Sequence, residues 1–179
     1  MDGAGSENLE IERKFLVDTS LWEPVGEGTL YVQGYVCADT EKAVRVRVAG
    51  ERAFLCIKGL VANFTRREFE YEIPLGDAAR LLELFCEAPP IEKRRHRESH
   101  HGKVWEIDVF LGDNDGLVVA EVELGSENEA VTLPEFAGAE VSTDPRYYSF
   151  NLQRNPFGRW ASDGAGEPNP PKGGRADPH

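Results

Sequence analysis

The chain has few cysteines, no long apolar run and a deficit of positive charge, and each shortage excludes a class of protein. Its three cysteines, Cys37, Cys56 and Cys86, are odd in number and far apart, so no CxxC pair offers a zinc site or a redox motif. Free thiols of this kind are typical of proteins in a reducing cytosol. No apolar run approaches the length of a transmembrane helix.

Acidic residues outnumber basic ones by 32 to 20, which gives a net charge of −12. This balance argues against a nucleic-acid-binding module, whose affinity comes from neutralising phosphates. It leaves room for a phosphate ligand inside a locally basic cavity. The first ten residues are acidic and contain glycine, unlike a secretory signal. We therefore expect a cytoplasmic protein that binds neither nucleic acid nor membrane.

The two ends of the chain differ in composition from its middle. Residues 161–179 are rich in glycine and proline with almost no apolar content, and are expected to form a disordered tail. Residues 1–8 are expected to be a flexible N-terminus. The remaining stretch, residues 9–160, has the length of one domain with a real core.

Alternation with a period of two dominates the middle of the chain and predicts β-strands. Eight strands are expected, at residues 9–17, 30–37, 42–49, 52–58, 66–73, 91–98, 103–110 and 117–124. Helices are expected at 78–87 and 144–153, with Asp77 and Asp144 as N-caps, and a helical or irregular piece near 127–138. Many short strands with turn signals indicate a mainly β (α+β) fold, with an antiparallel sheet closed into a barrel or folded into a sandwich.

One face of nearly every predicted strand is charged. Glu10, Glu12 and Lys14 alternate in the first strand, with Ile11 and Phe15 on the other face. Later strands repeat this spacing with Arg45 and Arg47, Lys58, Glu68, Glu70 and Glu72, Lys93 and Arg95, Glu106 and Asp108, and Glu121 and Glu123. Like charges at this spacing repel one another unless something bridges them.

The charged faces have two interpretations. A single charged strand face would be an ordinary solvated surface, and a sheet with one such face stays an alternative. The whole set favours an inward-facing site, because about eight strands enclose space for one small ligand. Carboxylates supply hard oxygen ligands for Mg²⁺ or Mn²⁺, while arginine and lysine bind phosphate oxygens. Metal-assisted phosphoryl transfer requires this combination.

The same residues resemble a known family, the CYTH domain or triphosphate tunnel metalloenzyme superfamily. Its Glu-x-Glu-x-Lys signature is matched by Glu10, Glu12 and Lys14. The resemblance covers roughly residues 9–157 in family order, through Gln33-Gly34-Tyr35, Arg45-x-Arg47, Ile57-Lys58-Gly59, Glu68-Phe69-Glu70, Lys93-x-Arg95, Glu106-x-Asp108 and Glu121-Val122-Glu123. It implies a closed eight-stranded antiparallel β-barrel, a tunnel with a charged interior and flanking helices.

The resemblance implies a metal-dependent enzyme acting on phosphoric anhydride bonds, most like the short inorganic triphosphatases that cleave tripolyphosphate to diphosphate and phosphate. Thiamine triphosphatase, nucleoside triphosphatase and class IV adenylate cyclase are alternatives, and a polyphosphate- or triphosphate-binding module is the non-enzyme alternative. No aromatic cluster stands out in the sequence to bind a base or a thiazolium ring. We expect a small-molecule polyphosphate substrate and a monomer or homodimer.

The site residues that the resemblance implies fall into four groups. The expected metal ligands are Glu10, Glu12, Glu70, Asp108, Glu121 and Glu123, with Mg²⁺ or Mn²⁺ as the cofactor. The expected phosphate-binding residues are Lys14, Arg45, Arg47, Lys58, Lys93 and Arg95. Glu12, Glu70 and Lys93 are expected to be catalytic, and Glu68 and Glu106 to line the tunnel. His96, His100 and His101 are expected to be exposed around a turn, and Tyr35, Tyr147 and Tyr148 to pack against other residues.

Overall fold

Antiparallel strands dominate the computed structural model, which describes residues 8–86 and 88–160. The strands are β1 (Leu9–Val17), β2 (Thr29–Ala38), β3 (Lys42–Ala49), β4 (Arg52–Ala62), β5 (Thr65–Ile73), β6 (Ile91–His100), β7 (Lys103–Phe110), β8 (Val118–Glu123) and β9 (Ala137–Glu140). The helices are α1 (Leu75–Phe85) and α2 (Ser149–Arg154), with 3₁₀ turns η1 (Gly112–Asn114), η2 (Pro145–Tyr147) and η3 (Phe157–Arg159). Apart from Asn8, the expected flexible N-terminus and the expected tail lie outside the described residues.

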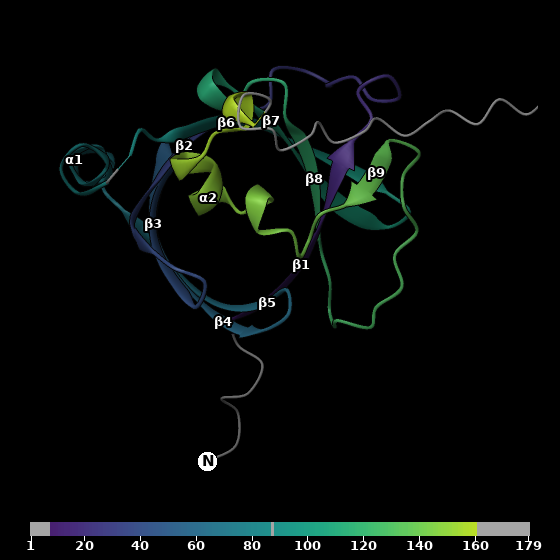
Figure 1. Ribbon diagram of the computed structural model, residues 1–179, viewed down its shortest axis with the longest axis horizontal. Coiled ribbons are helices and arrows are strands. Elements are labelled where there is room, and N and C mark those ends of the chain that lie inside the picture. Colours follow the sequence, from purple (N-terminus) through teal and green to yellow (C-terminus); the bar gives the residue numbers. More distant parts are fainter. Residues whose placement is uncertain (1–7, 87, 161–179) are drawn as a thin grey trace, which may run out of the picture.

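Eight of the strands close into a barrel, as Figure 1 shows. Their order is β5-β4-β3-β2-β6-β7-β8-β1, and pairing of β1 with β5 completes the ring. The first residues of β1 pair with β5, while its remaining residues pair with β8 on one side and β9 on the other. The closed barrel expected from the resemblance is therefore confirmed, and the sandwich is excluded.

The apolar outer face of β1, β7 and β8 forms the largest part of the core. Phe15, Trp105 and Val122 point away from the barrel interior and are buried. They are covered by Trp22 from the segment after β1 and by Phe136 from the segment before β9. A second apolar cluster joins the outer face of β3 and β4 to α1, which lies outside the ring (Figure 1).

One end of the barrel is filled by the chain that follows β9. Ile91 and Phe110, at the ends of β6 and β7, pack against Tyr147, Leu152 and Trp160 from η2, α2 and the residue after η3. In Figure 1, α2 lies within the outline of the ring. Tyr147 is buried, so its expected packing role is confirmed. No helix in the described part of the chain is long and apolar enough to span a membrane.

The first helix begins earlier than expected. We predicted residues 78–87 with Asp77 as the N-cap, whereas α1 starts at Leu75 after Pro74 and no side chain caps it. The fixed φ of proline suits the start of a helix, which explains the earlier boundary. The expected last residue, 87, lies outside the described residues.

The second predicted helix is interrupted. Asp144 does cap its start, since its carboxylate accepts a hydrogen bond from the backbone N–H of Arg146 at 3.0 Å. However, Tyr148 has an extended backbone, so the predicted segment 144–153 divides into η2 and α2. Packing of this segment into the barrel end, rather than its helical pattern, determines its path.

The segment near 127–138, expected to be helical or irregular, is irregular up to Phe136, and only residues 137 and 138 belong to β9, which adds to β1. One further expectation was wrong. His96 was expected to be exposed in a turn, but β6 continues to His100 and His96 is 6% exposed. Its ring packs edge-on against Trp22, with ring centroids 5.6 Å apart. The charged sequence of β6 gave no sign that His96, on the outer face of the strand, is covered by Trp22.

Candidate active site

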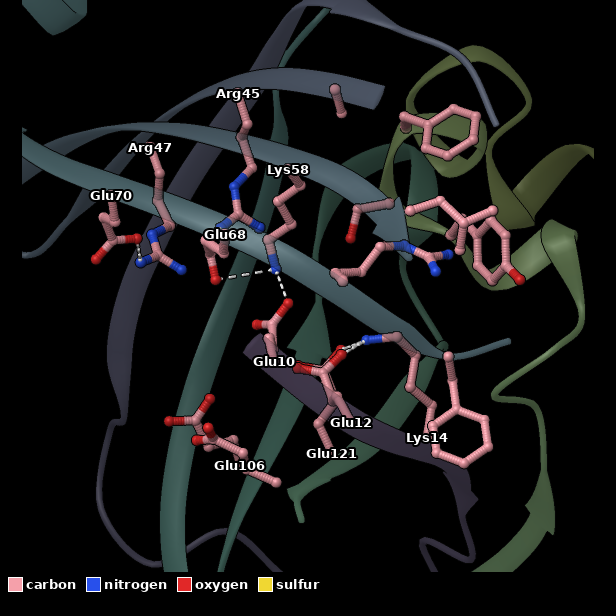
Figure 2. A pocket seen from close by; sticks show the side chains of 18 of the residues that line it. Glu10, Glu12, Lys14, Arg45, Arg47, Lys58, Glu68, Glu70, Glu106 and Glu121 are labelled. Atoms are coloured by element: carbon pink, nitrogen blue, oxygen red, sulfur yellow. Dashed lines mark hydrogen bonds and ion pairs between the residues drawn. The ribbon is translucent and has the colours of Figure 1, made fainter. Parts of the chain in front are cut away.

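The barrel encloses a charged cavity of about 670 Å³, part of which is drawn in Figure 2. Thirteen of the fourteen predicted site residues line it: Glu10, Glu12, Lys14, Arg45, Arg47, Lys58, Glu68, Glu70, Lys93, Arg95, Glu106, Glu121 and Glu123. They come from β1 and from β3 to β8, which surround the cavity. The charged face therefore lies inside, as predicted, because alternate residues of each strand share one face.

Strand register explains why charges distant in the sequence meet. On β1 and β8, Glu12 lies directly opposite Glu123, and Lys14 lies opposite Glu121. Lys14 forms ion pairs with both Glu12 and Glu121. One wall of the cavity is thus a group of carboxylates with a single lysine between them.

The wall formed by β3, β4 and β5 pairs its cations with carboxylates. Lys58 contacts Glu10 and, at 3.3 Å between Nζ and Oε2, also Glu68. Arg45 approaches Glu68 at 3.3 Å, measured from Nη2 to Oε1. Figure 2 shows Lys58 between Glu10 and Glu68. These pairs balance part of the charge of the cavity walls.

Asp108 is the predicted site residue that does not line the cavity. Its side chain is completely buried, and both of its oxygens already accept hydrogen bonds from Arg95, at 2.7 Å from Nε and 2.6 Å from Nη2. Lys93 also forms an ion pair with it. A position behind the wall suits a residue that orients Lys93 and Arg95 better than the metal-ligand role we expected.

Burial and neighbouring charges shift the pKa values of this inner group. Burial lowers the pKa of Lys93, and the charge of Asp108 offsets only part of this effect. Burial would raise the pKa of Glu121, but the charges of Lys14, Arg95 and Lys93 hold it well below its usual range. Glu121 is therefore ionised, and Lys93 gives up its proton more readily than an exposed lysine would.

Glu123 differs from the other carboxylates of the β1 and β8 wall because it has no cationic partner among the described residues. Its side chain forms no hydrogen bond or ion pair with the residues that the structure describes. Partial burial raises its pKa, and the like charges of Glu10, Glu12 and Glu106 raise it further. A carboxylate without a cationic partner, beside other hard carboxylate oxygens, belongs to the kind of donor set that a divalent cation satisfies.

A second group of possible ligands is less suited to such a cation. The donor atoms of Cys56, Glu68 and Glu70 lie within 4.8 Å of one another. The Cys56 thiol donates a hydrogen bond to Glu70 Oε2 at 2.9 Å, and burial raises its pKa. A protonated thiol is a poor ligand for Mg²⁺ or Mn²⁺, and Arg47 already pairs with Glu70.

Sequence reasoning missed two arginines of the cavity wall. Arg66 precedes Glu68 on β5, and Arg97 follows Arg95 on β6, each by two residues. Arg97 lies 3.3 Å from Glu106, measured from Nε to Oε1. One more step of the period-two alternation on each strand would have found both residues.

The structure also shows an aromatic group that the sequence did not reveal. Tyr35 of β2 and Tyr148 and Phe150 at α2 line the cavity together. The ring centroids of Tyr35 and Phe150 are 6.2 Å apart, and those of Tyr148 and Phe150 are 6.0 Å apart. Tyr35 and Tyr148 therefore pack as expected but also reach the cavity. Their separation in the sequence hides this grouping.

Comparison with known proteins identifies the family. Residues 8–148 match the family model described as the CYTH domain. This chain belongs to the CYTH family. The CYTH protein is 47% identical over 148 residues to an inorganic triphosphatase of Acetivibrio thermocellus, covering 83% of this chain and 95% of the relative. It is 34% identical over 146 residues to an inorganic triphosphatase of Nitrosomonas europaea, covering 77% and 92%.

Solved structures share the CYTH barrel. A crystal structure of an inorganic triphosphatase matches with a TM-score of 0.58 and 33% identity, covering 80% of this chain and 93% of that chain. A putative adenylate cyclase from Bacillus halodurans matches with a TM-score of 0.54 and 17% identity, covering 67% and 83%. The second similarity supports the fold alone.

Glu123 should make the stability of the metal-free CYTH protein depend on pH. Because its pKa is raised, the folded protein binds a proton there more readily than the unfolded chain does. The free energy of unfolding should therefore fall as pH rises from the ordinary carboxyl range through the raised pKa. Glu123→Gln should remove this part of the fall and be more stable than the wild type at neutral pH.

Urea denaturation in EDTA, at about pH 4 and about pH 7.5, measures this difference. Glu92→Gln is the matched control, because Glu92 is exposed on β6 and does not line the tunnel cavity. If Glu123→Gln and the wild type change in parallel between the two pH values, the raised pKa is contradicted.

Proposed function

We propose that this CYTH protein is a divalent-metal-dependent hydrolase that cleaves inorganic tripolyphosphate to diphosphate and phosphate. The observation that carries the proposal is the unpaired Glu123 carboxylate opposite Glu12, in a cavity that also carries six lysines and arginines of the predicted site. Metal and polyphosphate together would satisfy both sets of charges. The two inorganic triphosphatases to which the chain is similar support the same reaction.

Three carboxylates are proposed to hold the metal ion. Glu10 and Glu12 from β1 and Glu123 from β8 line the same cavity. The negative charges of Glu10 and Glu12 repel the Glu123 carboxylate, and a divalent cation bound among the three would relieve this repulsion. Their hard oxygens suit Mg²⁺ or Mn²⁺. When bound, such an ion supplies positive charge to the phosphate oxygens and lowers the pKa of water. Glu70 and Glu121 are proposed to act as further ligands or to order the attacking water.

The basic residues are proposed to bind the phosphate chain and to stabilise the negative charge that develops on it during cleavage. Arg45, Arg47 and Arg95 have planar guanidinium groups that bind phosphate in a bidentate manner, while lysines act as point charges. Lys14, Lys58 and Lys93 are the lysines of the cavity wall. Burial lowers the pKa of Lys93, which suits a residue that gives a proton to the leaving diphosphate.

Phosphate release from several triphosphates tests the proposal. We expect the purified protein to hydrolyse tripolyphosphate faster than ATP or thiamine triphosphate, and only when Mg²⁺ or Mn²⁺ is present. A colorimetric phosphate assay with and without EDTA gives the rates. Binding of tripolyphosphate without turnover of any of these compounds would leave a binding module as the better description. Faster turnover of ATP would favour a nucleoside triphosphatase.

The cellular setting is also a proposal. The cysteines Cys37, Cys56 and Cys86 are free thiols, which supports a reducing, cytoplasmic location. A small polyphosphate is the partner that the cavity fits, and we propose no nucleic-acid partner. The protein is proposed to act as a monomer or a homodimer.

A further inference from the structure

Arg66 differs from the other arginines on the tunnel wall. It lies on the inner face of β5, two residues before Glu68, and opposite Glu10 in the register of β1 and β5. Two residues of strand place it about 6.7 Å further along the wall than Glu68. Arg45, Arg47, Arg95 and Arg97 each pair with a carboxylate, whereas no carboxylate in the described part of the chain forms an ion pair with Arg66.

The guanidinium of Arg66 has unused donors. Its Nη1 donates to the backbone carbonyl oxygens of Asn63, at 3.2 Å, and Thr65, at 3.5 Å. Its Nε and Nη2 have no hydrogen-bond partner among the described residues. The planar fork that arginine uses to bind a phosphate is therefore still open at this position.

Arg66 also lies over one of the cavity's aromatic rings. Its guanidinium carbon is 5.8 Å from the ring centroid of Tyr148, the N-cap residue before α2. Tyr148 and Phe150 are among the rings that line the cavity, and they could stack on a nucleobase or another aromatic group. While Arg66 covers Tyr148, stacking on that ring is obstructed, yet the edge of the guanidinium stays available to an anion.

We propose that Arg66 is a specificity-determining residue, which binds a free terminal phosphate and disfavours triphosphates that carry an aromatic organic group at that end. The inference rests on the proposed triphosphatase function and adds the basis of its substrate choice. A free terminal phosphate carries more negative charge than an esterified one, so it gains more from the open fork. An organic triphosphate would present its organic group here and would have to displace Arg66 from Tyr148.

Arg66→Gln tests this role, with Arg67→Gln as the matched control. Both changes remove one positive charge from β5, but Arg67 is exposed and does not line the cavity. For each protein, kcat and KM are measured for tripolyphosphate and for ATP at the same Mg²⁺ concentration. We expect Arg66→Gln to lower kcat/KM for tripolyphosphate about tenfold, mainly through KM, while that for ATP stays equal or rises. Arg67→Gln should leave the ratio of the two unchanged.

The outcomes separate this inference from the proposed function. If the wild type hydrolyses tripolyphosphate but Arg66→Gln changes kcat/KM for tripolyphosphate and for ATP by the same factor, Arg66 has no role in specificity. If the wild type hydrolyses neither compound, the proposed function itself is wrong. Arg66→Lys serves as a second variant, since it keeps the charge without the planar fork; it should retain part of the preference. Complete retention of the preference in both variants would overturn the inference.

Discussion

Replacing Glu12 by glutamine is expected to lower tripolyphosphate turnover by about 10²–10³-fold, because the change removes one negative charge from the proposed metal site without changing its shape. Glu12 lies opposite Glu123 and pairs with Lys14. Lys14 would keep its second partner, Glu121, so the fold should persist. Higher Mg²⁺ concentrations should recover part of the lost rate if the loss is one of metal affinity.

Steady-state phosphate release over a range of Mg²⁺ concentrations gives the result for Glu12→Gln. The matched control is Glu92→Gln, which removes the same charge from the exposed face of β6. Thermal denaturation in EDTA establishes that both variants are folded. Equal turnover in Glu12→Gln and the wild type would refute the assignment of Glu12 as a metal ligand and catalytic residue.

Replacing Lys93 by methionine is expected to lower turnover by a similar factor, about 10²–10³-fold, through the loss of positive charge at the leaving diphosphate. Lys93 is 3% exposed and forms an ion pair with the completely buried Asp108. Removing one partner of a buried pair is ordinarily destabilising by about 3–5 kcal/mol. Here Arg95 still donates two hydrogen bonds to Asp108, so the loss of stability should be smaller.

The two effects of Lys93→Met can be separated by measuring both kcat and the free energy of unfolding. Lys103→Met is the matched control, because Lys103 pairs with Glu129 outside the cavity. Lys93→Arg keeps the positive charge and should retain more activity than Lys93→Met. A fall in kcat no larger than that of the Lys103 variant would show that Lys93 does not assist the leaving group.

The strands and their inward faces could be predicted from the sequence because that information is local, whereas closure into a barrel was expected only from the family resemblance. Apolar and charged residues alternate within each strand, and this pattern fixes which side chains point inwards. β9 carries little of this pattern, since its four residues, Ala137–Glu140, include one glycine and two alanines. The break at Tyr148 was also unpredictable, because it depends on how the C-terminal segment packs into the barrel end.

The site could be predicted as a set of residues but not as a set of contacts. The alternation and the family resemblance identified the charged residues of the wall, whereas the pairing of Lys58 with Glu10 depends on closure of the ring. The burial of Asp108 depends on its neighbours Lys93 and Arg95 and has no local signal. The contact between Arg66 and Tyr148 joins β5 to α2, and nothing in either segment alone indicates it.

The pairing of β1 with both β5 and β8 has a consequence for folding. Glu12 and Glu123 are direct neighbours across strands although they are 111 positions apart in the chain. Contacts of such sequence separation form slowly, because a long loop must be ordered before any pairing offsets the lost entropy. During synthesis residues 12–16 of β1 therefore have to wait for β8 to leave the ribosome. The carboxylate cluster is assembled only in the step that closes the barrel, so a partly folded chain has no complete metal site.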